Sequence, residues 1–202
     1  PLVSIIIPTR DQVKYLEPCI DSIKQKTRYP NYEILVIDNQ SDGQETLTYF
    51  DDLKNENKIT VVKYDYSFNY SAINNFAAQR ANGEILVFLN NDTEVITPDW
   101  LDEMIGYAVR PQIGAVGAML YYPNDTIQHA GVVLGINGIA GHIYYGSPRD
   151  SIGQRGRLRL VQNFSAITAA CMAVEKRKFQ EIKGFNEKQL PIAYNDIDFC
   201  LR

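Results

Sequence analysis

Residues 85–89 of this 202-residue chain form an unbroken apolar run, and Asn90, Asn91 and Asp92 follow it immediately. A strand without polar interruption is typical of a parallel sheet that helices cover on both faces. The carboxyl ends of such strands are where open α/β sheets bind ligands. A single run could equally be a core strand followed by a solvated loop. The arrangement recurs in this chain, however, which favours a ligand site.

Two further apolar runs, at residues 3–7 and 33–37, end in the same way. The residues that follow them are Pro8, Thr9, Arg10 and Asp11 in the first case, and Asp38 and Asn39 in the second. A shorter strand is predicted at 59–62, and amphipathic spacing predicts helices at 15–26, 46–53 and 70–80. Strands that alternate with helices form right-handed crossovers and a mostly parallel sheet. We therefore expect Asp11, Asp38 and Asp92 to face one crevice.

The second half of the chain is less regular. We predict helices at 100–109 and 175–182, a strand at 115–120, and a last helix that opens near Asp196. Residues 161–174 are expected to form a buried strand or a close-packed segment. Residues 129–142 are rich in glycine, which indicates short strands or a loop close to a ligand. Residues 146–157 have the composition of a mobile surface loop. The length fits one domain, 1–202, and the pattern stops abruptly at Arg202, so we expect a truncated C-terminal half.

The overall composition narrows the class of protein. Hydrophobic residues make up 45% and charged residues 22%, and the net charge is −4. This balance argues against a nucleic-acid partner, which would need a basic face. We find neither a transmembrane run nor a signal peptide, so we expect a cytoplasmic location, with peripheral attachment to the inner face of the membrane as one option. The three cysteines have no CxxC spacing, so neither a disulfide framework nor a zinc site is indicated.

The polar strand ends suggest how a phosphate would be held. Neither of the two common glycine-rich phosphate loops follows a strand in this sequence. The remaining way to hold a phosphate is a metal ion that bridges it to a carboxylate. Asp92 and Asn90 offer oxygen ligands suited to Mn²⁺ or Mg²⁺.

Four motifs together carry a family resemblance. They are 3–9 (Val-Ser-Ile-Ile-Ile-Pro-Thr), 33–41 (Glu-Ile-Leu-Val-Ile-Asp-Asn-x-Ser), 83–92 (Gly-Glu-Ile-Leu-Val-Phe-Leu-Asn-Asn-Asp) and 195–202 (Asn-Asp-x-Asp-x-Cys-Leu-Arg). In this order and spacing the sequence resembles family 2 glycosyltransferases, including members that assemble surface polysaccharide such as O-antigen. The resemblance extends over nearly the whole chain.

The resemblance implies a GT-A fold, with a Rossmann-like, mostly parallel sheet flanked by helices. Residues 1–95 would bind the nucleotide-sugar donor, and the less regular residues 96–202 would bind the acceptor. Members invert the anomeric centre with the help of a divalent metal, Mn²⁺ or Mg²⁺. The donor expected here is a UDP- or dTDP-sugar, and the acceptor is a saccharide or a lipid-linked saccharide.

By position, the resemblance also implies residue roles. Asn90 and Asp92 match the DxD metal motif, and Asp196 matches the general base. The donor would contact the strand ends, namely Pro8, Thr9, Arg10, Asp11, Asp38, Asn39, Asn90 and Asn91. Asp198 is the alternative base, although residues two apart on a helix face different directions. Without the family, these two acids would be interpreted as residues that favour a helix dipole.

Two departures from the family pattern leave other functions open. Asn90 replaces the first Asp of DxD, and Asn195 replaces the Glu that precedes the base. A non-catalytic nucleotide- or carbohydrate-binding module is therefore an alternative, and a nucleotidyltransferase on a similar sheet is another. His129 and His142 are either structural hydrogen-bonding residues or contacts to donor or acceptor. The tyrosine pairs 121–122 and 144–145 could stack on sugar rings.

Overall fold

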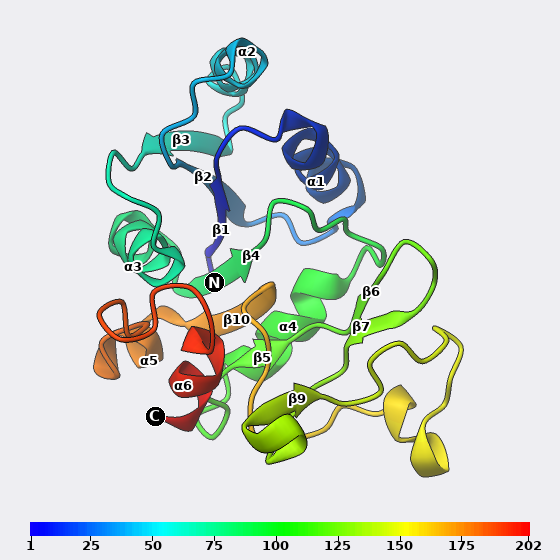
Figure 1. Ribbon diagram of the computed structural model, residues 1–202. Helices are drawn as coiled ribbons and strands as arrows, with labels where there is room; N and C mark the ends of the chain where they lie inside the picture. The colour runs from blue at the N-terminus through cyan, green and yellow to red at the C-terminus, as the bar shows by residue number, and fades with distance from the viewer.

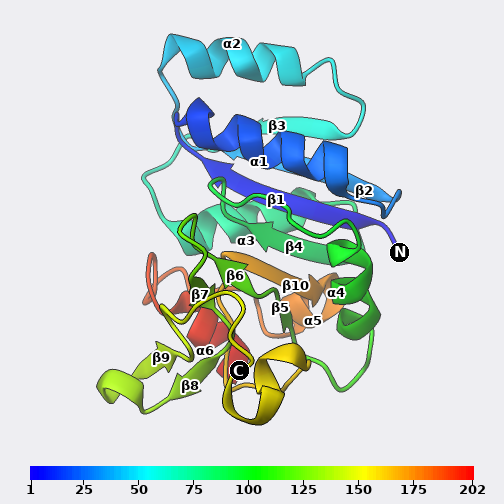
Figure 2. The ribbon, with the colours of Figure 1, turned by 90° about the vertical axis from the view of Figure 1, so that its right-hand side faces the viewer.

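The computed structural model describes residues 1–202, apart from the side chain of Asn137. Six strands form the central sheet in the order β3-β2-β1-β4-β10-β5. The first four in this order are parallel, as predicted, and Figure 2 shows them side by side, with β1 starting at the N-terminus on the right. Their bounds are β1 Val3–Thr9, β2 Tyr32–Asp38, β3 Ile59–Lys63 and β4 Ile85–Leu89. The polar strand ends therefore lie along one edge, as the sequence predicts.

Helices cover both faces of the sheet because the apolar runs have side chains pointing both ways. Ile5 and Ile7 of β1 pack in one apolar cluster, and Ile6 packs in the other. The first cluster includes α1 (Val13–Lys26), α2 (Gln44–Leu53) and α4 (Trp100–Ala108). The second includes α3 (Tyr70–Arg80), α5 (Lys176–Glu181) and α6 (Asn195–Leu201). Figure 1 shows α1 and α3 on opposite sides of β1.

The second half of the chain completes the sheet and adds two hairpins beside it. Strand β10 (Cys171–Glu175) runs antiparallel to β4 and pairs with the short edge strand β5 (Val116–Gly117). β6 (Leu120–Tyr121) pairs with β7 (Ile127–His129), and β8 (Val132–Leu134) pairs with β9 (Ala140–His142). Two short 3₁₀ helices, η1 (Ile136–Gly138) and η2 (Gln154–Arg159), lie at the bottom of the molecule in Figure 2.

Two strand predictions need correction. The strand predicted at 115–120 is split into β5 and β6, with the intervening residues outside both strands. The strand predicted within 161–174 begins only at Cys171, and Val161 is 69% exposed. Before β10 the segment packs closely and pairs only at Ala166, which forms an isolated antiparallel bridge with Val132. Gly117 shows how close this packing is, because an added Cβ there would lie 2.8 Å from Ile167 Cβ.

Helix α6 carries Asp196 and is fixed at both ends. Near its C-terminus, Phe199 packs against Phe179 and Phe185, with ring centroids 5.4 and 5.1 Å away. At its start, buried Asn195 donates a hydrogen bond to Ser71 Oγ at 3.0 Å. Aromatic packing of this kind adds to the stability that apolar burial provides. The position of Asp196 is therefore set by the core of the domain.

Among the described residues, no helix has the length and apolarity needed to cross a membrane.

Candidate active site

The loops after β1 and β2 are locked together by the two acids that the sequence placed there. Asp11 Oδ1 accepts from the Gly43 backbone N–H at 3.0 Å, and the Asp11 N–H donates to Ser41 Oγ at 2.8 Å. Asp38, 4% exposed, accepts from the Ser41 N–H at 2.8 Å. Charged acceptors make strong bonds to backbone N–H groups. The two strand ends thus form one connected wall of polar groups at the carboxyl end of the sheet.

Asn39 sits beneath this wall and is 2% exposed. Its Nδ2 donates to the carbonyl oxygens of Tyr64, at 3.2 Å, and Tyr66, at 2.8 Å. Its backbone N–H donates to Thr9 O at 2.8 Å. The residue therefore ties the ends of β1 and β2 to the loop that follows β3. With these contacts, Asn39 holds the strand ends and this loop in position.

The end of β4 supplies the next group of predicted residues. Asn91 Nδ2 donates to Thr9 Oγ1 at 2.9 Å, which joins the end of β4 to the end of β1. Asn90 is half-buried, and its backbone N–H donates to Ala170 O at 3.0 Å. Asp92 is exposed, and its carboxylate accepts no hydrogen bond from the described residues. Of the three residues, Asp92 is the one whose side chain is exposed.

A short chain of contacts connects Asp196 to this strand end. The Ala169 backbone N–H donates to Asp196 Oδ2 at 3.2 Å. The Ala169 carbonyl accepts from the Tyr70 hydroxyl at 3.1 Å, and the same hydroxyl lies 3.4 Å from Asn90 Oδ1. Residues from α6, α3 and the ends of two strands thus meet at one point. The predicted base and the predicted metal motif are brought together.

Tyr70 is kept neutral at this junction. Burial raises the pKa of its hydroxyl, and the negative charges of Asp196 and Asp92 raise it further. A neutral phenol has one O–H to donate, and the Ala169 carbonyl at 3.1 Å is a closer acceptor than Asn90 Oδ1 at 3.4 Å. No role was predicted for Tyr70, which in the sequence is only the first residue of the helix predicted at 70–80. Its contacts are to residues 20 and 99 positions away.

Asp198 is directed away from this junction. Its Oδ2 accepts from Arg202 Nε at 2.8 Å, and the Arg202 Nη atoms donate to the carbonyls of Ile182 and Gly184 at 2.7 Å. Asp198 and Arg202 together hold the end of α6 against residues 182–184. Between the two candidate bases, the geometry favours Asp196.

The residues present suit a metal that is shared with a diphosphate. Asp92 offers a hard, exposed carboxylate, and the Asn90 amide oxygen lies nearby on the same loop. Among the described residues, no cluster of three or more His, Cys, Asp or Glu side chains is arranged to hold an ion. Mg²⁺ and Mn²⁺ commonly take one or two carboxylates and complete their shell with phosphate oxygens and water. The donor set fits that arrangement.

Pro8 and Arg10, the remaining predicted donor contacts, lie at the end of β1. Pro8 is half-buried within β1, and Arg10 is exposed and forms no ion pair among the described residues. Asp11 and Gln12 have positive φ values of 52° and 63°, which turn the chain sharply after β1. Arg10 is thus a free cation beside the strand ends.

The two histidines form a pair outside the crevice. His129 is 1% exposed, its Nδ1 lies 2.9 Å from His142 Nδ1, and its Nε2 accepts from the Thr168 N–H at 3.4 Å. Burial lowers the pKa of His129 to about 3, with a smaller effect from His142. His129 is therefore a neutral, structural residue. Tyr122 and Tyr145 pack edge-to-face against each other, whereas Tyr144 lines a cavity.

Comparison with known proteins agrees with this geometry. The sequence profile described as Glycosyl transferase family 2 matches residues 4–182. The chain belongs to glycosyl transferase family 2. The O-antigen biosynthesis protein RfbC of Myxococcus xanthus is 40% identical over 203 residues, which cover all of this chain and 16% of that protein. The chain spans about a fifth of the length of the curated relatives that it matches from end to end.

Solved structures place the family 2 domain in the GT-A fold. The mannosyltransferase PcManGT from Pyrobaculum calidifontis, in complex with GDP-Man and Mn²⁺, has a TM-score of 0.68 at 17% identity, with 98% of this chain and 50% of that chain covered. GalNAc-T7 with UDP, GalNAc and Mn²⁺ has a TM-score of 0.77 at 16% identity, with 98% and 40% covered. The prediction of fold class is confirmed.

Proposed function

We propose that this domain transfers a sugar, with inversion, from a nucleotide diphosphate sugar to a hydroxyl group of a saccharide or lipid-linked saccharide. The observation that carries the proposal is the contact chain from Asp196 through Ala169 and Tyr70 to Asn90. These contacts connect the Asp196 carboxylate to Asn90 of the metal motif, although Asp196 comes over one hundred residues later in the sequence. Family membership favours this reaction over nucleotidyl transfer.

In this proposal residues 1–95 bind the donor. The wall formed by Asp11 and Asp38 faces the nucleoside, with Thr9 and Asn39 holding the strand ends in place. Arg10 is free to approach the diphosphate. Related folds solved with GDP-Man, with UDP and with UDP-GlcNAc support a nucleotide sugar as the donor, and a UDP- or dTDP-sugar is our expectation here.

A divalent metal, Mn²⁺ or Mg²⁺, would be held by Asp92 and Asn90 and would stabilise the negative charge that builds on the leaving diphosphate. The neighbours that contain Mn²⁺ support this assignment. Because Asn90 adds no charge, the protein contributes one carboxylate, and the diphosphate itself must complete the site.

Asp196 is the proposed general base. The acceptor hydroxyl must lose a proton as its oxygen attacks the anomeric carbon, and inversion requires attack from the face opposite the leaving group. The Ala169 N–H fixes one carboxylate oxygen, Oδ2, while Oδ1 accepts from the Ile197 N–H at 2.8 Å. These two bonds fix the orientation of the carboxylate.

The biological setting follows from the relatives. The RfbC relative is named for O-antigen biosynthesis, which supports a part in cell-surface polysaccharide assembly. For the chain as it works in the cell, we propose a cytoplasmic position at the inner face of the membrane. Residues 96–202 would then present the acceptor to the donor half.

Calorimetry with UDP, GDP and dTDP, each with and without Mn²⁺, tests the donor site. We expect at least one nucleotide to bind only with Mn²⁺, and Asp92→Asn to abolish this dependence. Asp99→Asn is the matched control, because Asp99 is exposed beyond the strand end and its side chain caps no helix N–H. Binding that is indifferent to Mn²⁺ and to Asp92 would refute the metal–diphosphate site.

Turnover separates the remaining alternatives. Release of nucleoside diphosphate from a nucleotide sugar supports transfer. Release of pyrophosphate from a sugar 1-phosphate and a nucleoside triphosphate would instead support a nucleotidyltransferase. Nucleotide binding without any turnover would support a non-catalytic module.

A further inference from the structure

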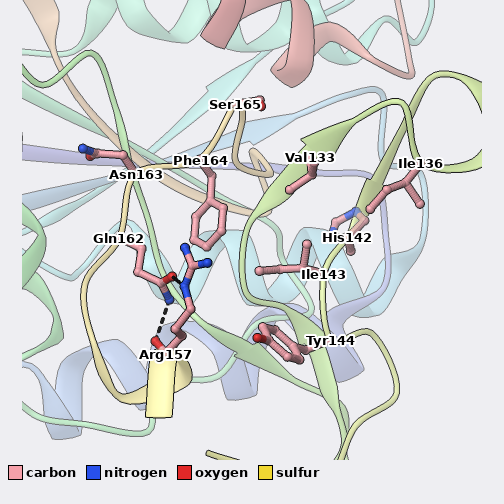
Figure 3. Close-up of a pocket in the computed structure, with 10 residues that line it drawn as sticks. All are labelled: Val133, Ile136, His142, Ile143, Tyr144, Arg157, Gln162, Asn163, Phe164 and Ser165. Carbon is pink, nitrogen blue, oxygen red and sulfur yellow. Dashed lines mark hydrogen bonds between the residues drawn. The ribbon is translucent and has the colours of Figure 1, made fainter. Parts of the chain in front are cut away.

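A cavity of about 810 Å³ lies between the β8–β9 hairpin and residues 157–165, separate from the donor crevice (Figure 3). We call it the hairpin pocket. Its polar lining includes Arg157, Gln162, Asn163 and His142, and its aromatic lining consists of Tyr144 and Phe164. The volume is in the range of small-molecule sites, which combine apolar walls with a few placed polar groups. None of the residues assigned to the donor or the base lines it.

The guanidinium of Arg157 is oriented before any ligand arrives. Arg157 Nε donates to Gln162 Oε1 at 2.7 Å, and Gln162 Nε2 donates back to the Arg157 carbonyl at 2.5 Å. Figure 3 shows the guanidinium between Phe164 and Tyr144. Its two Nη groups have no hydrogen-bond partner among the described residues, and Arg157 forms no ion pair there. A planar donor fixed at one edge presents the other edge to the pocket.

His142 adds a second donor through its pairing with His129. Because His129 Nε2 accepts from Thr168, the proton of the neutral His129 ring resides on Nδ1 and is donated to His142 Nδ1. Because His142 Nδ1 acts as the acceptor in this contact, the N–H of the His142 ring is on Nε2. The buried histidine thereby sets the tautomer of the exposed one that lines the pocket.

The aromatic walls are also held in place. Gly131 has φ 118°, and a Cβ there would lie 2.4 Å from the Phe164 ring, so the ring occupies the space that a side chain would need. The Tyr144 hydroxyl accepts from the Gln154 N–H at 3.1 Å. Rigid aromatic rings offer apolar faces to sugar rings at a low entropic cost.

The pocket is close to the proposed base along the chain. Ser165 lines the pocket, and Ala169, four residues later, donates its N–H to Asp196. Four residues span at most about 14 Å. The pocket therefore lies within the reach of a short oligosaccharide that has its reacting end at Asp196 and its next units in the pocket.

We propose that the hairpin pocket is an acceptor subsite that binds the saccharide units adjoining the sugar whose hydroxyl attacks. The inference rests on the proposed function and adds a ligand class and a location. Phe164 and Tyr144 stack on pyranose rings, and Arg157 and His142 donate hydrogen bonds to hydroxyl or ring oxygens. The specificity of the hairpin pocket would come from how the saccharide oxygens are arranged around the fixed guanidinium of Arg157.

The test uses backbone amide NMR of the ¹⁵N-labelled protein, titrated with trisaccharides of rhamnose, mannose, galactose and N-acetylglucosamine. We expect at least one of them to shift the amides of Ile143, Phe164 and Ser165. Arg157→Gln and Phe164→Leu should each weaken that binding about tenfold. Arg149→Gln should not, because Arg149 pairs with Asp125 outside the pocket. The spectra also report whether each variant is folded.

The outcomes distinguish this inference from the proposed function. Nucleotide binding without a saccharide shift at the pocket, or saccharide shifts that Arg157→Gln and Phe164→Leu leave unchanged, would overturn the subsite alone. Failure of UDP, GDP and dTDP to bind would overturn the donor site, whereas saccharide binding in the pocket would still stand. In Asp92→Asn, saccharide binding should persist with an unchanged dissociation constant.

Discussion

The backbone N–H of Ala169 donates to Asp196 Oδ2 at 3.2 Å, and this one contact places the proposed base beside the end of the sheet. Ala169 belongs to the turn that leads into β10, the strand that pairs with β4. The base is therefore positioned relative to the metal motif through the sheet itself. A helix packed on the surface alone would leave that distance free to vary.

Asp196→Asn should remove the general base without disturbing the fold. The amide oxygen can still accept from Ala169, although the bond from the Ile197 N–H is lost, and an amide cannot take up a proton at neutral pH. We expect kcat to fall about 10²- to 10⁴-fold, with donor binding unchanged. Steady-state kinetics and UDP titration measure the two quantities.

The matched variant for this experiment is Asp198→Asn. It weakens the pair with Arg202 and should lower stability by at most about 1 kcal/mol, with kcat largely retained. Equal loss of kcat in both variants would contradict the assignment of the base to Asp196.

Tyr70→Phe should disturb the link between the base and the metal motif. The change deletes the bond to the Ala169 carbonyl and the contact with Asn90. A polar group left unpaired in a partly buried site costs about 1–3 kcal/mol. We expect a lower urea midpoint and a lower kcat together. Tyr66→Phe is the control, because Tyr66 is 66% exposed, and it should change neither quantity.

Asn90→Asp should restore a second charge to the metal motif. A carboxylate about 4 Å from a cation gains on the order of 1–4 kcal/mol over a neutral group, which corresponds to roughly tenfold or more in affinity. Titration with Mn²⁺ in the presence of UDP measures this gain. Unchanged affinity would show that Asn90 does not face the ion.

The stability of the protein should decrease in acid because of His129. Its pKa is lowered to about 3 in the folded protein, against 6.5 for the ordinary side chain, so the unfolded chain binds the extra proton first. The contribution of neutral His129 to the free energy of unfolding is therefore complete above pH 6.5 and is lost as the pH falls toward 3. The slope is at most about 1.4 kcal/mol per pH unit.

Urea unfolding at pH 6.5 and 5.0 tests this, since most carboxylates remain ionised in that interval. His129→Gln should flatten the dependence while lowering stability at both values. An equal pH dependence in the variant would contradict the role of His129.

Much of the fold could be predicted from the sequence, because the spacing of apolar residues in each strand and helix indicates which of its faces are buried. The unbroken runs at 3–7, 33–37 and 85–89 predict parallel strands buried on both faces, and the helices between them cover those faces. The polar residues after these runs identify the edge that binds ligands. The motif at 195–202 predicts an acidic residue near it.

Only the tertiary structure decided how these pieces act together. Contacts between distant segments decide that Asp196 faces the end of the sheet while Asp198 pairs with Arg202. They also decide the position of Tyr70 and the path of residues 161–170 beside the sheet. Such contacts leave no period in the local sequence, because a hydrogen bond across 27 or 99 residues depends on how complete elements pack. Local pattern thus determined the strands, the helices and the ligand-binding edge, whereas packing determined which side chains meet there.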